Sequence, residues 1–114
     1  MGRKQKYDIP IWKFNYKLKD KNKKFVSIYH NQLCNEKFRK MPLNAQMLYI
    51  YMLDYSNGSI ETTFPYRFYK GIMTTPTFNK CIEELQDKGF IEIMERGKFN
   101  HKPNVYRFTD KWYK

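Results

Sequence analysis

The chain has 114 residues and a mass of 14.1 kDa, a length that suits one domain and is too short for two ordinary ones. It carries 22 Lys and Arg against 11 Asp and Glu, a formal net charge of +11, which indicates a polyanionic partner such as nucleic acid or an anionic membrane surface. Aromatic residues make up 18% of the chain. This excludes a disordered basic tail, because such tails lack the apolar groups that offset chain entropy.

The positive charge is concentrated at the N-terminus. Residues 1–24 contain nine basic and two acidic residues, a net charge of +7, which leaves +4 for the rest of the chain. This change in composition predicts a basic arm over residues 1–24 and a domain over residues 25–114. Apolar and mostly basic residues alternate over 12–18, as in a strand with one apolar and one basic face.

Residues 25–28 are expected to form a returning strand after a turn at 20–23. The arm is then a basic β-ribbon. The alternative is that residues 1–10 are mobile and the strand packs its aromatic side chains on the domain. Both interpretations remain open at the level of the sequence.

Residues 43–55 have the strongest helical pattern in the chain. Asn44 is expected to cap the helix, with Leu43 and Leu48 forming a hydrophobic staple. Apolar residues occupy nearly every side of this helix, which indicates burial on more than one face. Either the N-terminal ribbon or another subunit would cover the second face. The helix is expected to stop at residues 57–58, Asn-Gly, which tolerate positive φ.

The next segment predicts a short extended stretch and two helices. Residues 59–64 are expected to be extended, followed by a brief helix over 65–70 with Pro65 in its first turn. A longer helix is then expected from an N-cap at Thr75, with Pro76 at the first helical position, to Lys88. Gly89 should follow it in a left-handed conformation.

The C-terminal part of the chain predicts two strands around a basic loop. Residues 90–95 and 105–108 are expected to pair antiparallel. The loop between them, 96–104, contains four potentially cationic side chains. Residues 109–110 are expected to cap a final helical turn that carries Trp112 and Tyr113.

The order of these elements resembles the winged helix-turn-helix superfamily. The likeness is carried by Thr77-Phe78, Cys81-Ile82, Glu84-Leu85 and Gly89-Phe90-Ile91. A narrower likeness, to the helix-turn-helix domains of plasmid, phage and transposon proteins and to the N-terminal domains of plasmid replication initiators, is carried by Phe25-Val26-Ser27-Ile28, Leu43-Asn44-Ala45, Leu48-Tyr49, Leu53-Asp54 and Pro103-Asn104-Val105-Tyr106.

This resemblance covers about residues 25–112. It implies an α+β fold, with a three-helix core and a two- to three-stranded antiparallel wing. In this chain the basic arm would precede that fold. In replication initiators more chain normally follows the wing, so their later functions are not carried over. The arm of residues 1–24 has no counterpart in the family.

The helix over 75–88 is expected to read DNA. Phe78, Cys81, Ile82 and Leu85 share one narrow apolar stripe at helical spacing, and the opposite face is then free to enter a major groove. Hydroxyls and helix amides suit phosphate oxygens, while Asn and Lys read base edges. The predicted DNA contacts are Thr74, Thr75, Thr77, Asn79 and Lys80 on this helix, Arg96, Lys98, His101 and Lys102 in the basic loop, and Lys13 and Lys17 in the arm.

Catalytic and metal chemistries have weaker support. Glu83 and Glu84 are adjacent and diverge by about 100° on a helix, so they cannot form a facing acid–base pair. His30 and Cys34 can share a helix face, but Cys81 and His101 lack the spacing of a zinc knuckle. We therefore expect no enzymatic activity, no metal and no cofactor.

The leading hypothesis is a sequence-specific, double-stranded DNA-binding protein of a mobile genetic element. It would act as a transcription regulator or as an accessory factor in replication or conjugation, reading the major groove with helix 75–88 and the backbone or minor groove with loop 96–104. A homodimer is an open alternative to a monomer. With no apolar run long enough for a membrane span and no hydrophobic signal region, we expect a cytoplasmic protein with no membrane partner.

Two other functions are also consistent with the sequence. The apolar helix over 44–55 could make the chain a protein-interaction module. The arm could bind single-stranded nucleic acid, with Trp12, Phe14 and Tyr16 stacking on bases.

Overall fold

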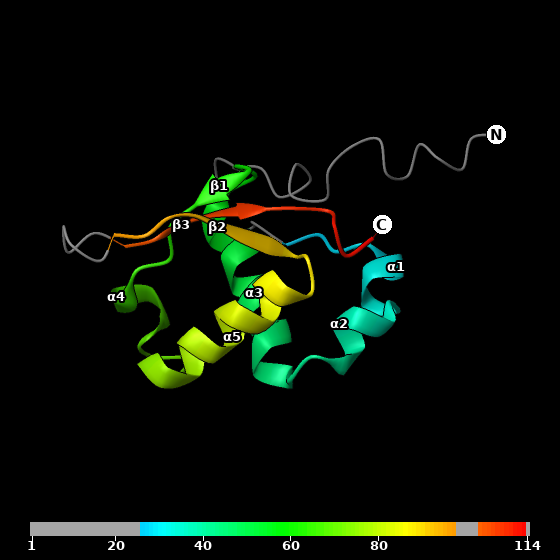
Figure 1. Cartoon of the computed structure of the whole chain (residues 1–114), viewed down its shortest axis with the longest axis horizontal. Coiled ribbons are helices and arrows are strands. Elements are labelled where there is room, and N and C mark those ends of the chain that lie inside the picture. The colour runs from blue at the N-terminus through cyan, green and yellow to red at the C-terminus, as the bar shows by residue number, and fades with distance from the viewer. Residues whose placement is uncertain (1–25, 98–102, 114) are drawn as a thin grey trace.

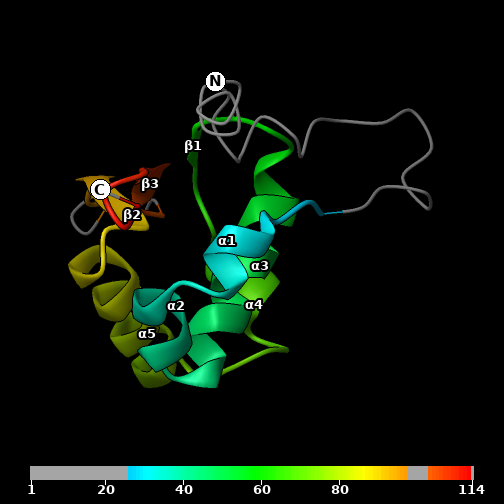
Figure 2. The ribbon, with the colours of Figure 1, turned by 90° about the vertical axis from the view of Figure 1, so that its right-hand side faces the viewer.

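Helices and a small antiparallel sheet make up the fold, and the sheet lies on one side of the helices in both views (Figures 1 and 2). The first strand lies between the third and fourth helices in the chain, and the other two strands follow the last helix. The computed structural model describes residues 26–97 and 103–113. The elements in chain order are α1 (His30–Leu33), α2 (Glu36–Lys40), α3 (Leu43–Ser56), β1 (Glu61–Thr62), α4 (Tyr66–Tyr69), α5 (Thr75–Asp87), β2 (Ile91–Glu95) and β3 (Val105–Phe108). The predicted α+β class is confirmed.

The predicted strand over 25–28 is wrong for its described residues. Residues 26–29 form neither helix nor strand and lead directly into α1. Val26 and Ile28 are partly buried against the core instead of pairing with a strand. Residues 1–24, with the predicted arm, strand and turn, lie outside the described residues.

Helices α1 and α2 were not predicted, because each is too short to show a helical period in the sequence. Asn35 caps α2, since its side-chain oxygen accepts a hydrogen bond from the backbone N–H of Lys37 at 2.8 Å. Phe38 of α2 is buried in the core. A helix of five residues is unstable in isolation, so the packing of the Phe38 ring and the Asn35 cap stabilise α2.

Helix α3 begins at Leu43, whereas an N-cap at Asn44 would make residue 45 the first residue of the helix. Pro42 is the N-cap, and its carbonyl accepts hydrogen bonds from Ala45 and Gln46 at 3.0 and 3.1 Å. Asn44 therefore lies inside the first turn, and the predicted Asn44 cap is wrong. The staple is wrong as well, because the Leu43 side chain is 77% exposed. The predicted end is confirmed, with Asn57 at φ 55° and Gly58 at φ 85°.

One side of α3 is buried and another is exposed. Ala45, Leu48, Tyr49, Met52 and Leu53 lie in the core. Leu43, Met47 and Tyr51, spaced four residues apart, are exposed on the described part of the molecule. Whether the arm or a second subunit covers this exposed stripe stays a prediction.

The sheet has three antiparallel strands in the order β1-β3-β2. Strand β3 is central, pairing Arg107 with Glu61 of β1 and with Glu92 of β2. The predicted pairing of β2 with β3 is confirmed, and residues 61–62 of the predicted extended stretch become the third strand. A register shift between Ile93 and Glu95 bends β2 just before the basic loop.

Helix α5 starts at Thr75, so the N-cap is Thr74 and the predicted cap at Thr75 is wrong. Thr74 has the extended backbone of a cap (φ −76°, ψ 162°), and its carbonyl accepts the N–H of Phe78 at 2.8 Å. Pro76 consequently occupies the second helical position. The N–H groups of the first helical turn have no partner within the helix, and proline has no N–H to leave unpaired. Pro76 therefore fits the second helical position as well as the predicted first one.

The end of α5 follows the prediction at Gly89. The N–H of Gly89 donates to Gln86 at 3.1 Å and the N–H of Phe90 donates to Leu85 at 2.9 Å, the two hydrogen bonds of a Schellman motif. Gly89 adopts φ +89°. Its carbonyl accepts the hydroxyl of Thr109 at 2.5 Å and the N–H of Trp112 at 3.2 Å, so the predicted C-terminal turn docks on this glycine.

Aromatic rings fill the core between α3, α5 and the sheet. Tyr49 makes edge-to-face contacts with Phe38, Phe90 and Phe108 at centroid distances of 5.5 to 6.3 Å. The Trp112 ring stacks on Phe90 at 5.4 Å. Tyr49 is fully buried, and its hydroxyl has no hydrogen-bond partner among the described residues. Burial raises the pKa of Tyr49 far above its ordinary value, so the hydroxyl stays protonated.

The Tyr49→Phe variant is expected to raise the free energy of unfolding by about 1 kcal/mol, because it removes a buried hydroxyl that has no partner while keeping the ring. Urea denaturation monitored by circular dichroism measures the change. The Tyr49→Leu variant is the control and is expected to destabilise, since it deletes the edge-to-face contacts. A loss of stability in Tyr49→Phe would show that the hydroxyl is paired.

Candidate nucleic-acid interface

Helix α5 has the two faces that the sequence predicts. Phe78, Cys81, Ile82 and Leu85 are buried. The thiol of Cys81 is a free cysteine, and burial, followed by the charge of Glu84, raises its pKa. The opposite face exposes Asn79, Lys80, Glu83 and Asp87.

The predicted threonine contacts lie together at the start of α5, where two of them, Thr74 and Thr75, are exposed. The hydroxyl of Thr74 donates to the hydroxyl of Thr77 at 3.1 Å. The hydroxyls of Thr75 and Tyr69 lie 3.1 Å apart, within hydrogen-bond distance. These side chains therefore also hold α4 against α5, assisted by the Tyr69 and Phe78 rings, which stack at 3.9 Å and 2°.

Asn79 and Lys80 are the exposed polar residues of α5 that remain available for a ligand. Neither side chain makes a hydrogen bond or ion pair with another residue of the described segments 26–97 and 103–113. Toward the C-terminal half of α5, Glu83 and Asp87 make the exposed face acidic. Only the N-terminal half can therefore approach a polyanion without charge repulsion.

The basic loop is described only at its two ends. Arg96 is exposed directly after β2, and the N–H of Gly97 donates to the side-chain oxygen of Asn104 at 3.0 Å, which ties the two ends together. Lys98, His101 and Lys102 lie outside the described residues, as do Lys13 and Lys17 of the arm. Their predicted contacts stay predictions.

Sequence reasoning missed basic residues on α4. Arg67 in α4 and Lys70 at its C-cap are exposed, and the Arg67 guanidinium lies 4.9 Å from the centre of the Phe68 ring. The signal was present in the sequence, because two basic residues occur in the short helix just before the turn into α5. Arg67 joins Lys80 and Arg96 as an exposed cation around the N-terminal half of α5.

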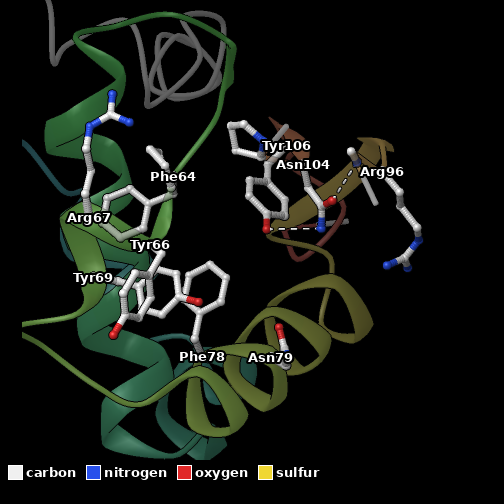
Figure 3. A pocket seen from close by; sticks show the side chains of 12 residues that line it. Phe64, Tyr66, Arg67, Tyr69, Phe78, Asn79, Arg96, Asn104 and Tyr106 are labelled. Atoms are coloured by element: carbon white, nitrogen blue, oxygen red, sulfur yellow. Dashed lines mark hydrogen bonds between the residues drawn. The ribbon is translucent and has the colours of Figure 1, made fainter. Parts of the chain in front are cut away.

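A cleft of about 860 Å³ opens between α4, α5 and the base of the loop (Figure 3). It is lined by residues 64–67, 69, 78–79, 96–97, 103–104 and 106, and none of these residues is acidic. Figure 3 shows the Tyr106 hydroxyl directed into the cleft from the sheet and Asn79 directed into it from α5. The Arg96 side chain extends away from the cleft along its rim.

Two hydrogen bonds in series position the Tyr106 hydroxyl. The side-chain amide of Asn104 accepts from Gly97 and donates to the Tyr106 oxygen at 3.4 Å. Burial raises the pKa of Tyr106, although the hydrogen bond from Asn104 and the charge of Arg96 oppose the shift. The phenol is therefore protonated at neutral pH and retains one hydrogen to donate.

No protein-family model, curated protein or solved structure matches this chain. Its function is therefore inferred from the described residues and their geometry.

A metal site and a membrane span have no support in the described residues. Cys34 is exposed, and its Sγ lies 3.4 Å from Nε2 of His30, so these two residues do share a face as their spacing suggests. Within residues 26–97 and 103–113, no three metal-ligating side chains gather into one site. In the same residues, no helix combines the length and the apolar character needed to cross a bilayer.

Proposed function

We propose that this protein binds double-stranded DNA as a winged helix-turn-helix domain. The order of α3, β1, α4, α5, β2 and β3, with the sheet order β1-β3-β2, supports this assignment. Helix α4, the turn over 70–74 and helix α5 would form the helix-turn-helix, and β2, β3 and their loop would form the wing. Sequence-specific binding, as in a regulator or a replication or transfer factor of a mobile element, is part of the same proposal.

The observation that carries the proposal is the exposed N-terminal half of α5. Asn79 and Lys80 project from it without partners in the described part of the chain, and basic residues flank it on both sides. Asn and Lys are side chains that read base edges in a major groove, whereas Arg67 and Arg96 suit phosphate oxygens. The acidic C-terminal half of α5 would lie away from the duplex.

The test is fluorescence anisotropy of the full chain with a labelled 30-bp duplex over a salt series. If about eight cationic groups contact phosphates, the logarithm of the association constant should fall with the logarithm of the salt concentration at a slope of about −7. Asn79→Ala should relax sequence preference, while Arg96→Ala should weaken binding to every sequence alike. Absence of binding at low salt, or a slope near zero, would contradict the proposal.

A further inference from the structure

We propose that the cleft between α4, α5 and the base of the loop binds a single nucleotide, with the base stacked on Tyr66 and hydrogen-bonded by Tyr106 and Asn79. The ligand is a nucleobase joined to a phosphate. It is either a free nucleotide or an unstacked nucleotide within a DNA strand. The inference goes beyond reading a duplex and does not depend on it.

The size and lining of the cleft fit this ligand. Its volume of about 860 Å³ lies within the range of small-molecule sites. The lining contains aromatic rings from three separate segments, two arginines and no acidic residue. An anionic, planar ligand therefore meets aromatic surface without charge repulsion.

Tyr66 supplies the stacking surface. Its side chain is 58% exposed at the edge of the cleft, and its ring stands at 88° to Tyr69 with the centroids 5.3 Å apart. Tyr69 is itself fixed by the stack on Phe78. Tyr66 is thus an exposed aromatic ring held on a rigid support, the arrangement that proteins use to stack single bases.

Two polar groups face the same space. The Tyr106 phenol is nearly fully buried, is oriented by Asn104, and keeps one hydrogen for a base nitrogen or carbonyl. Asn79, directed into the cleft from α5, offers both a donor and an acceptor (Figure 3). The attached phosphate would lie at the rim of the cleft, where Arg67 and the outward-directed Arg96 provide cationic groups.

The first experiment titrates the ¹⁵N-labelled full chain with 2′-deoxyadenosine 5′-monophosphate and, separately, with inorganic phosphate. The mononucleotide is expected to shift the backbone amides of Asn79, Gly97 and Asn104, and phosphate alone is not. Tyr66→Ala should weaken mononucleotide binding about tenfold, the loss of one stacking contact. Tyr106→Phe should weaken it about fivefold, the loss of one hydrogen bond.

Matched variants outside the cleft separate binding from folding. Tyr51→Ala removes an equally large aromatic side chain, 41% exposed on α3, and Tyr49→Phe removes a buried phenol. Both should bind the mononucleotide as the wild type does. If the amides of Asn79, Gly97 and Asn104 do not shift, or if Tyr66→Ala binds as tightly as Tyr51→Ala, the inference is overturned.

The second experiment distinguishes the two sources. Anisotropy compares a fully paired 30-bp duplex with the same duplex carrying one unpaired adenosine. If the bulged duplex binds about tenfold more tightly than the paired one, and Tyr66→Ala abolishes this difference, the cleft binds a nucleotide of a DNA strand. Mononucleotide binding without a preference for the bulge assigns it to a free nucleotide. Duplex binding without either effect leaves the proposed function standing and overturns this inference alone.

Discussion

Replacing Gly89 with alanine is expected to lower the free energy of unfolding by about 3 kcal/mol or more, because two costs combine at this position. Gly89 has φ +89°, a backbone conformation that L residues other than glycine rarely adopt. A Cβ there would also lie 2.8 Å from the backbone nitrogen of Trp112 and 2.9 Å from Cβ of Lys111. The C-terminal turn would have to shift and loosen the stack of Trp112 on Phe90.

Urea denaturation of the variant measures this loss, and Gly71→Ala is its control. Gly71 follows α4, does not have a positive φ, and has open space within 4 Å of the position that a Cβ would take. Its substitution should change the free energy of unfolding by less than about 1 kcal/mol, in either direction. Equal stabilities for the two variants would mean that the C-terminal turn does not dock on Gly89.

Reversing two charges, Lys80→Glu with Arg96→Glu, is expected to weaken duplex binding on the order of 100-fold at moderate salt. Each substitution removes a favourable contact and adds repulsion from the DNA backbone. A single contact of this kind contributes about 1–3 kcal/mol, so two reach this loss together. Anisotropy with the 30-bp duplex at a fixed salt concentration measures the effect.

A control with the same change in net charge is Lys37→Glu with Lys40→Glu on α2. In Figure 1, α2 lies on the opposite side of the molecule from α4 and from the N-terminal end of α5, the half of that helix that carries Lys80. The Lys40–Glu36 pair is highly exposed, so its loss costs little stability. Binding should weaken less than about fivefold, because solvent and salt screen distant exposed charges. An equal loss in both double variants would show that net charge, and not α5 with the wing, governs binding.

The sequence predicted the surface of α5 well and the cleft not at all. The apolar stripe of Phe78, Cys81, Ile82 and Leu85 follows from helical spacing, so the exposure of Asn79 and Lys80 was predictable too. The cleft brings Tyr66 near Asn104 and Tyr106, residues almost forty positions later in the chain. No local pattern indicates that these residues line one cleft, because their proximity depends on how the sheet is assembled.

Local chemistry of neighbouring residues determined where several elements end. Positive φ angles at Asn57 and Gly58 end α3, and the Schellman motif at Gly89 ends α5. Strands β2 and β3 follow from segments rich in β-branched and aromatic residues. Each of these features depends on a few residues that are neighbours along the chain. The same local rules misplaced the starts of α3 and α5 by one or two residues, since several adjacent residues can each serve as an N-cap.

Only the tertiary structure decided which segments meet. Val26 and Ile28 pack on the core and not in a strand, and the five-residue helix α2 is held by the burial of Phe38. The two residues of β1 become a strand because β3 offers them an edge, more than forty residues later in the sequence. Such contacts bring distant segments together at a cost in chain entropy, and burial of the shared aromatic core offsets that cost. The burial of this core depends on the whole fold. Sequence patterns of a few residues therefore determine helix ends and helix faces, but they do not determine which distant segments come into contact.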